Sequence, residues 1–296
     1  MPRNLELPGN QPKWIFHSGS ETAPNMPAVM QTTMSSPLPP EIFDLIVDFL
    51  HDEPDALKAC CLVSKSWVHR TRKHLFAQVK FASKYPFKLW QKTFPDPSDS
   101  PAHYARSLSI RMSEAVTPAD TGAGNWIRAF SDVIRLKLAI VHIDPSLAPL
   151  HGLSPTLKSL HVHHGSSLRL SEIFGLVCSF PLLEDLTLIS SNFNYEVDEW
   201  NVPSASPKLT GCLDLRPTRS ILPVVHRLLE LPSGLHFSKI SMWYSREDVE
   251  LMTELVSKCS DTLESLNIRY RCLGAIFFFG FTVCQHLIAI CEYSHG

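Results

Sequence analysis

RLKLAI, residues 135–140, is one of seven short segments of this chain in which apolar and polar residues alternate around an L-x-L-like core. Successive side chains of a β-strand point to opposite faces, so this alternation predicts a strand with one buried face. The first apolar positions of the seven segments recur at intervals of 24 to 28 residues. These positions are Leu108, Leu136, Leu160, Leu186, Leu213, Ile240 and Leu266.

The interval matches the period of leucine-rich repeats, in which each repeat pairs one strand with a helix or turn. Helical spacing of apolar residues occurs between several of the segments, at 126–134, 171–180, 221–229 and 248–256. Strand and helix at a near-constant period predict a right-handed βα solenoid with a curved parallel sheet. The repeats are irregular, because 145–156 and 192–209 are loops rich in Pro, Ser and Asn. A doubly wound α/β sheet is the alternative architecture, and it requires no regular period.

The residues between the buried positions of each segment are expected on the opposite, exposed face of the sheet. They include five Arg or Lys and two His against two Asp, although the whole chain has a net charge of −2. We predict that this face recruits a protein target with an acidic or phosphorylated segment, and a solvated face without a ligand is the alternative. The candidate target-binding residues are Arg111, Arg135, Lys137, His161, His163, Arg216, Trp243 and Arg269.

Upstream of the repeats, residues 38–76 read LPPEIFDLIVDFLHDEPDALKACCLVSKSWVHRTRKHLF and predict three helices. The proline pair suits the first turn of a helix, because its fixed φ is helical and its missing N–H needs no partner there. The first helix carries an apolar stripe from Ile42 to Leu50, yet Phe43 and Val47 lie off that stripe and are apolar too. A unit of about 40 residues cannot bury a helix that is apolar on nearly every side, so this surface requires a partner.

This stretch resembles the F-box, the three-helix adaptor module of cullin-type ubiquitin ligases. The resemblance rests on Leu38, Pro39, Glu41, Ile42, Ile46, Leu50, Asp55, Leu57, Leu62, Val63, Ser64 and Trp67. It implies docking onto a Skp-type adaptor, and through it onto a cullin scaffold, without catalysis by the module itself. A plain three-helix bundle with only internal contacts is the alternative. The implied adaptor-binding residues are Leu38, Pro39, Ile42, Ile46, Leu50, Leu57, Leu62, Val63 and Trp67.

The aromatic segment that follows, with FPDP at 94–97, is similar to segments that follow the F-box in fungal proteins. The fold class implied is α/β, a three-helix F-box followed by an irregular leucine-rich-repeat βα solenoid. We expect a disordered leader, an F-box, a connector, the solenoid and an apolar C-terminal segment, at 1–36, 37–77, 78–105, 106–270 and 271–296. The function implied is a cytoplasmic or nuclear substrate receptor of a ubiquitin ligase. The alternatives are a leucine-rich-repeat scaffold without a role in ubiquitin transfer and an adaptor anchored in a membrane by its C-terminal segment.

Residues 272–291, CLGAIFFFGFTVCQHLIAIC, are nearly all apolar over a length that matches a membrane span. Gln285 and His286 interrupt this segment, and no basic cluster flanks its far end. Three interpretations remain open, namely a buried last element of the repeats, a membrane anchor and an irregular end of the repeat array.

Several function classes are disfavoured by what the chain lacks. Eight scattered cysteines without a CxxC pair indicate a reduced, intracellular chain without zinc-ligand spacing. The net charge of −2 argues against a dedicated nucleic-acid binder. The sequence contains none of the motifs typical of phosphate-binding loops, zinc proteases and serine hydrolases. We therefore expect no enzymatic activity, no cofactor and no metal site, and expect His161 and His163 to face solvent.

Overall fold

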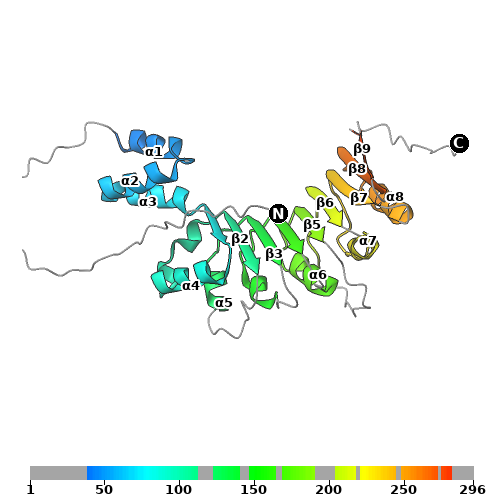
Figure 1. Ribbon diagram of the computed structural model, residues 1–296, viewed down its shortest axis with the longest axis horizontal. Helices are drawn as coiled ribbons and strands as arrows, with labels where there is room; N and C mark the ends of the chain where they lie inside the picture. The colour runs from blue at the N-terminus through cyan, green and yellow to red at the C-terminus, as the bar shows by residue number, and fades with distance from the viewer. Residues whose placement is uncertain are drawn as a thin grey trace, which may run out of the picture. The chain divides into compact units, whose positions relative to one another are not determined.

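The computed structural model describes residues 39–112, 123–140, 147–164, 169–190, 204–217, 221–244, 248–272 and 275–281. Three helices come first, α1 (Pro40–Phe49), α2 (Pro54–Val63) and α3 (Lys65–Leu75), and together we call them the three-helix unit. Eight parallel strands follow in one sheet and alternate with helices, as Figure 1 shows. The chain is therefore an α/β protein, and its architecture is consistent with a βα repeat.

The strand order in the sheet equals the order along the chain. Strands β1 to β8 pair in parallel, and β9 runs antiparallel to β8. The strands are β1 (Gln78–Phe81), β2 (Ser107–Met112), β3 (Arg135–Ile140), β4 (Ser159–His164), β5 (Asp185–Ser190), β6 (Cys212–Pro217), β7 (Lys239–Tyr244), β8 (Ser265–Cys272) and β9 (Ala275–Phe281).

Helices α4 to α8 all cover the same face of the sheet (Figure 1). They are α4 (Lys84–Thr93), α5 (Ala123–Arg128), α6 (Leu170–Cys178), α7 (Leu222–Leu229) and α8 (Val249–Lys258). Short 3-10 helices lie at η1 (Pro97–Asp99), η2 (Pro101–Tyr104) and η3 (Ala148–Gly152). The helices leave the opposite face of the sheet uncovered by any element of the described ranges (Figure 1).

The seven predicted strand segments are β2 to β8, and they stand in register. Leu108 pairs sideways with Leu136, Leu136 with Leu160, and the same pairing continues to Ile240 and Leu266. From Leu108 to Ile240 these first apolar residues are buried beneath the helices. The prediction of strands with one buried face is thus confirmed, because a constant repeat length places equivalent residues side by side.

β1 is an additional strand that lies in the segment predicted to be a connector. Its Val79 and Phe81 pair with Leu108 and Ile110 and are buried like the equivalent residues of the other strands. The sheet therefore begins one unit before residue 106, where the solenoid was predicted to start, and has eight parallel strands instead of seven. β1 has only four residues, with Val and Phe at the positions where the other strands have leucines, so it lacks the L-x-L motif.

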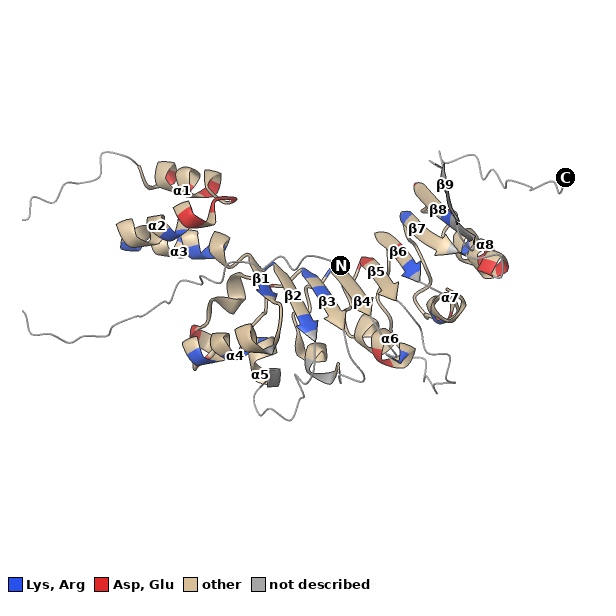
Figure 2. Cartoon of the chain, in the orientation of Figure 1, with Lys and Arg blue, Asp and Glu red and all other residues tan. Residues whose placement is uncertain are grey.

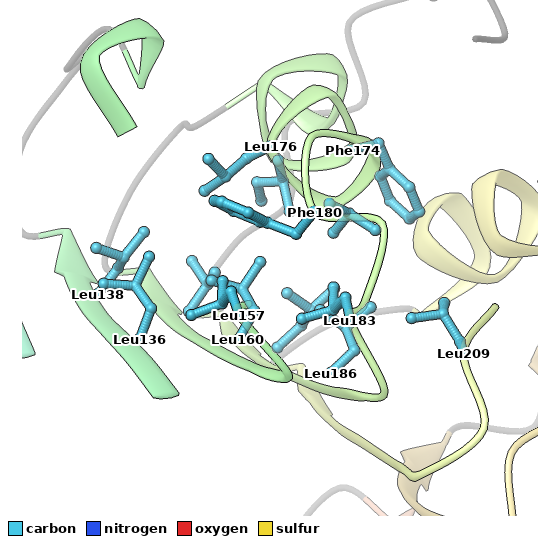
Figure 3. Close-up of a cluster of buried hydrophobic side chains, with 14 of the residues drawn as sticks. Leu136, Leu138, Leu157, Leu160, Phe174, Leu176, Phe180, Leu183, Leu186 and Leu209 are labelled. Carbon is cyan, nitrogen blue, oxygen red and sulfur yellow. The ribbon is translucent and has the colours of Figure 1, made fainter. Parts of the chain in front are cut away.

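The core is one continuous layer between the helices and the sheet. α6 contributes Ile173, Leu176 and Val177, whose apolar side faces the strands. Figure 3 shows Phe180, just after α6, with its ring between Leu176 and the leucines of the β4 repeat. Burial of this layer is the main source of stability, at roughly 25 cal/mol for each Å² of apolar surface removed from water.

Two of the repeats predicted to be irregular have no α-helix predicted between their strands, at 145–156 and at 192–209. In the segment predicted as a loop at 145–156, η3 takes the helix position, and its Leu150 and the flanking Leu147 and Leu153 are buried. The loop predicted at 192–209 lies outside the described residues up to residue 203. Beyond it, the carboxylate of Asp185 accepts a hydrogen bond of 2.7 Å from the Cys212 backbone amide. This bond ties the start of β6 to β5 after the long connection.

The apolar C-terminal segment contributes β9, whose residues 275–281 pair with β8. In this part the segment extends the sheet by one antiparallel strand, and 282–296 lie outside the described residues. The leader predicted at 1–36 lies outside them as well. Among the described helices, none has the length and apolarity needed to cross a bilayer.

Candidate interaction surfaces

Helix α1 has two apolar sides that serve different purposes. Val47 is buried, and the Phe43 ring lies against the Trp67 ring of α3 with 5.3 Å between centroids. Ile42, Leu45, Ile46 and Phe49, at i, i+3, i+4 and i+7, are all exposed, Leu45 at 64% and Phe49 at 84%. The residues off the predicted stripe thus make the internal contact, whereas the stripe itself meets solvent.

A second exposed apolar pair lies at the end of α2, where Leu62 is 85% and Val63 70% exposed. The helix stops there because Ser64 is extended and its side chain accepts a hydrogen bond from the Ser66 amide, which starts α3. We call the six exposed residues of α1 and α2 the apolar docking residues. They are Ile42, Leu45, Ile46, Phe49, Leu62 and Val63.

The predicted adaptor-binding residues divide into three groups. Pro39, Ile42, Ile46, Leu62 and Val63 are exposed, and Leu50 and Trp67 are half-buried. Leu57 is buried inside the three-helix unit and is not accessible to a partner in this structure, while Leu38 lies outside the described residues. Leu45 and Phe49 are not among the residues that the resemblance implies, although both belong to the predicted apolar stripe from Ile42 to Leu50.

Exposed apolar side chains are concentrated in the three-helix unit. Among the described residues, six of the ten large hydrophobic side chains with high exposure belong to α1 and α2. The βα repeats, in contrast, bury nearly all of theirs. Large exposed apolar groups on a small unit indicate a protein-interaction site.

A polar cluster fixes α1 against α3. The Asp48 carboxylate accepts one hydrogen bond of 2.7 Å from Arg70 Nε, a second from the other arm of the same guanidinium, and a third of 2.7 Å from His74 Nε2. These hydrogen bonds, with that to Arg70 foremost, hold the pKa of the Asp48 carboxyl well below its usual range. The cluster orients α1, and with it the exposed stripe.

Replacing Asp48 with Asn is expected to lower the free energy of unfolding of the three-helix unit by about 1 kcal/mol, the order found for partly exposed ion pairs. A carboxyl with a depressed pKa stabilises the fold above its unfolded pKa of about 3.9, and this stabilisation is lost as the pH falls toward the folded pKa. The difference between wild type and variant should therefore stay constant above about pH 5 and shrink as the pH falls below about pH 4. Amide hydrogen exchange in α1 and α3 measures this difference in the free energy of unfolding.

Lys58→Gln is the matched control for Asp48→Asn, because it removes the ion pair of Lys58 with the almost fully exposed Asp55 in the same unit. It should leave amide exchange in α1 and α3 nearly unchanged, since exposed pairs contribute little. A stability loss in Asp48→Asn that does not vary with pH would contradict the role given to the carboxylate.

The uncovered face of the sheet carries polar residues in registered rows. The central row crosses all eight parallel strands, and each residue in it is paired sideways with the next. Its members are Lys80, Ser109, Lys137, His161, Thr187, Asp214, Ser241 and Asn267. Arg111 and His163 lie in a neighbouring row, and Arg135 lies in the row on the other side.

The predicted target-binding residues all lie on this face, but their surroundings differ. Arg216 donates two hydrogen bonds, of 3.0 and 2.6 Å, to the carboxylate of Asp214, so its charge is already paired. Arg269 lies over the Trp243 ring at 5.8 Å, and both side chains are half-buried. Arg111, Arg135 and Lys137 are exposed.

The histidines of β4 separate into two environments. His161 and His163 are on the uncovered face, whereas His164 is buried on the helix side, where burial lowers its pKa to about 4. Burial, reinforced by nearby Lys137, also lowers the pKa of His161, which keeps that ring neutral near pH 7. The described part of the chain holds no group of three or more His, Cys, Asp or Glu side chains arranged to bind a metal ion.

Lys80 is a residue of this face that sequence reasoning missed. It lies on β1, exposed, in register with Ser109 of β2. It lies in the segment predicted as a connector, where the Val-Lys-Phe alternation is only a weak strand signal.

Comparison with known proteins adds no indication of function. No protein-family model matches this chain, and no curated protein and no solved structure matches it either. A function can therefore be inferred only from the apolar docking residues and from the polar face of the sheet.

Proposed function

We propose that this chain is the substrate-receptor subunit of a cullin-type ubiquitin ligase. Its three-helix unit docks a Skp-type adaptor, and the uncovered face of its sheet recruits a protein target. One observation supports this most directly, the exposure of the apolar docking residues in the stretch that resembles the F-box. A helix bundle with only internal contacts has no reason to expose Phe49, Leu62 and Val63.

The energetics of docking favour a stable complex. Full burial of an exposed Val, Leu, Ile or Phe side chain contributes roughly 1.5–3 kcal/mol, and six such residues, with exposures between 39% and 85%, are available. Association costs of about 4–15 kcal/mol offset part of this gain. Phe49, as the most exposed aromatic residue of α1, is the natural anchor, since aromatic side chains dominate binding energy at interfaces.

The role of this chain in ubiquitin transfer is to provide proximity. A target held on the sheet and an adaptor held on α1 and α2 bring target lysines near the conjugating enzyme. The effective concentration of the reacting groups then rises without a catalytic residue in this chain. This division of labour explains why one part of the chain exposes apolar groups and the other polar groups.

Reconstitution with a purified Skp-type adaptor tests the proposal. The full chain should form a one-to-one complex in size-exclusion chromatography, with a dissociation constant of about 1 μM or lower by calorimetry. Binding should also show a negative heat-capacity change, because apolar surface is removed from water. If no complex forms, the chain is better described as a repeat scaffold without a role in ubiquitin transfer.

A further inference from the structure

We infer that the part of the uncovered sheet face formed by β1 to β4 binds an extended, carboxylate-rich segment of a protein target. This inference rests on the proposed function, since it names the chemistry of the target that the receptor would hold. We call this part the basic half-face. Its residues are Lys80, Arg111, Arg135, Lys137, His161 and His163.

Charge separates the basic half-face from the rest of the sheet. The residues of β1 to β4 on the uncovered face include no Asp or Glu, although the whole chain has a net charge of −2. The cations of β1, β2 and β3 make no ion pair with any described residue. On β5 and β6, in contrast, Asp185 and Asp214 are present, and the latter pairs with Arg216. In Figure 2, β1 to β3 carry blue without red, red appears at the start of β5, and β6 and β7 carry blue again.

The cations are spread out, which decides between two kinds of anion. Neighbouring strands lie about 4.8 Å apart, so Lys80 and Lys137, with Ser109 between them, are about 10 Å apart at their backbones. Arg135 is likewise flanked by serines, on β2 and β4. A single phosphate group meets a cluster of convergent arginines best, whereas the two arginines of this half-face, Arg111 and Arg135, lie on different strands and in different rows. Carboxylates repeated along an extended segment, about 7 Å apart on one side, match dispersed cations.

The polar residues between the cations support the same class of ligand. Ser107, Ser109 and Ser159 lie between or beside the basic side chains and supply hydroxyl donors to carboxylate oxygens. Nucleic acid fits less well, because the described residues of β1 to β4 on this face include no Phe, Tyr or Trp side chain on which a base would stack. A strand of phosphates also favours a larger basic excess than this chain has.

Fluorescence anisotropy on the full chain at low salt tests the inference, with fluorescein-labelled hexaglutamate as the probe. Hexaglutamate should bind, hexaglutamine should not, and binding should weaken as salt is added. Lys137→Glu should weaken hexaglutamate binding about fivefold, and the Arg135→Glu/Lys137→Glu double variant more than about tenfold. Lys239→Glu is the matched control, because Lys239 is an exposed lysine on the same face at β7 and its reversal changes the net charge equally. It should change the affinity less than about twofold.

Several results would overturn the inference. The first is that hexaglutamate does not bind, and the second is that Lys137→Glu and Lys239→Glu lower its affinity equally. The third is that a neutral peptide with one phosphoserine, or oligothymidylate, binds more tightly than hexaglutamate. All reversed residues are exposed, so circular dichroism should stay unchanged. Adaptor binding is measured on the same variants. If the wild-type chain binds the adaptor but not hexaglutamate, only this inference fails. If the wild-type chain does not bind the adaptor, the proposed function itself is contradicted.

Discussion

Changing both Phe49 and Leu62 to Asp is expected to weaken binding of the Skp-type adaptor at least about 100-fold. Both side chains are more than four-fifths exposed, at 84% and 85%, so neither contributes much to the stability of the unit. At an interface, each change removes roughly 1.5–3 kcal/mol of apolar burial and places a charge where water is excluded. Calorimetry with the purified adaptor measures the loss.

The control for this double variant is Tyr85→Asp with Leu89→Asp on α4. These residues are also exposed, large and apolar, but they belong to the first βα unit and not to α1 or α2. Adaptor affinity should remain within about twofold of wild type. If the control variant loses binding as strongly as the Phe49/Leu62 variant, or if the latter still binds, the docking role of α1 and α2 is wrong.

Trp67 is a poorer choice for this experiment, although the F-box resemblance includes it. Its ring contacts Phe43, and it is half-buried between α1 and α3. A polar substitution there would disturb the three-helix unit as well as any interface. The structure therefore shifts the test from Trp67 to exposed residues, where binding and folding can be separated.

Phe180→Ala is expected to lower the free energy of unfolding of the repeats by about 3–5 kcal/mol, the usual cost of truncating a fully buried Phe. Phe180 is 0% exposed and fills the space between α6 and the leucines of the neighbouring strands (Figure 3). The adjoining repeats cannot collapse onto the cavity, because the register of β4 and β5 holds them apart. Urea denaturation followed by far-ultraviolet circular dichroism measures the change.

Leu182→Ala is the matched control, because Leu182 lies two positions away and is 53% exposed. Its stability loss should stay below about 1 kcal/mol, since little apolar surface is returned to water. Similar losses in the two variants would show that Phe180 is not part of a tightly packed core. Adaptor binding should survive in both variants at low temperature, because neither residue belongs to α1 or α2.

The candidate sites were predictable to different degrees. The alternation in β2 to β8 identified which residues lie on the uncovered face of the sheet, because the face of a strand residue depends only on its position along the chain. It did not reveal that Asp214 neutralises Arg216, since a side-chain ion pair depends on rotamers. In the three-helix unit, the motif identified Ile42 and Leu62 correctly as surface residues, but it also included Leu57, which is buried.

Local periodicity was enough to predict the α/β class, the positions of seven strands and the helices α6, α7 and α8, because periods of 2 and of about 3.6 residues depend only on near neighbours in the chain. The three-dimensional structure was needed to show that β1 joins the sheet, that η3 replaces a helix, and that β9 runs antiparallel to β8. It also decided which of two apolar sides of α1 lies inside. These features depend on pairing and burial against distant residues, and a helix that is apolar on both sides carries no signal for which side its own chain will cover.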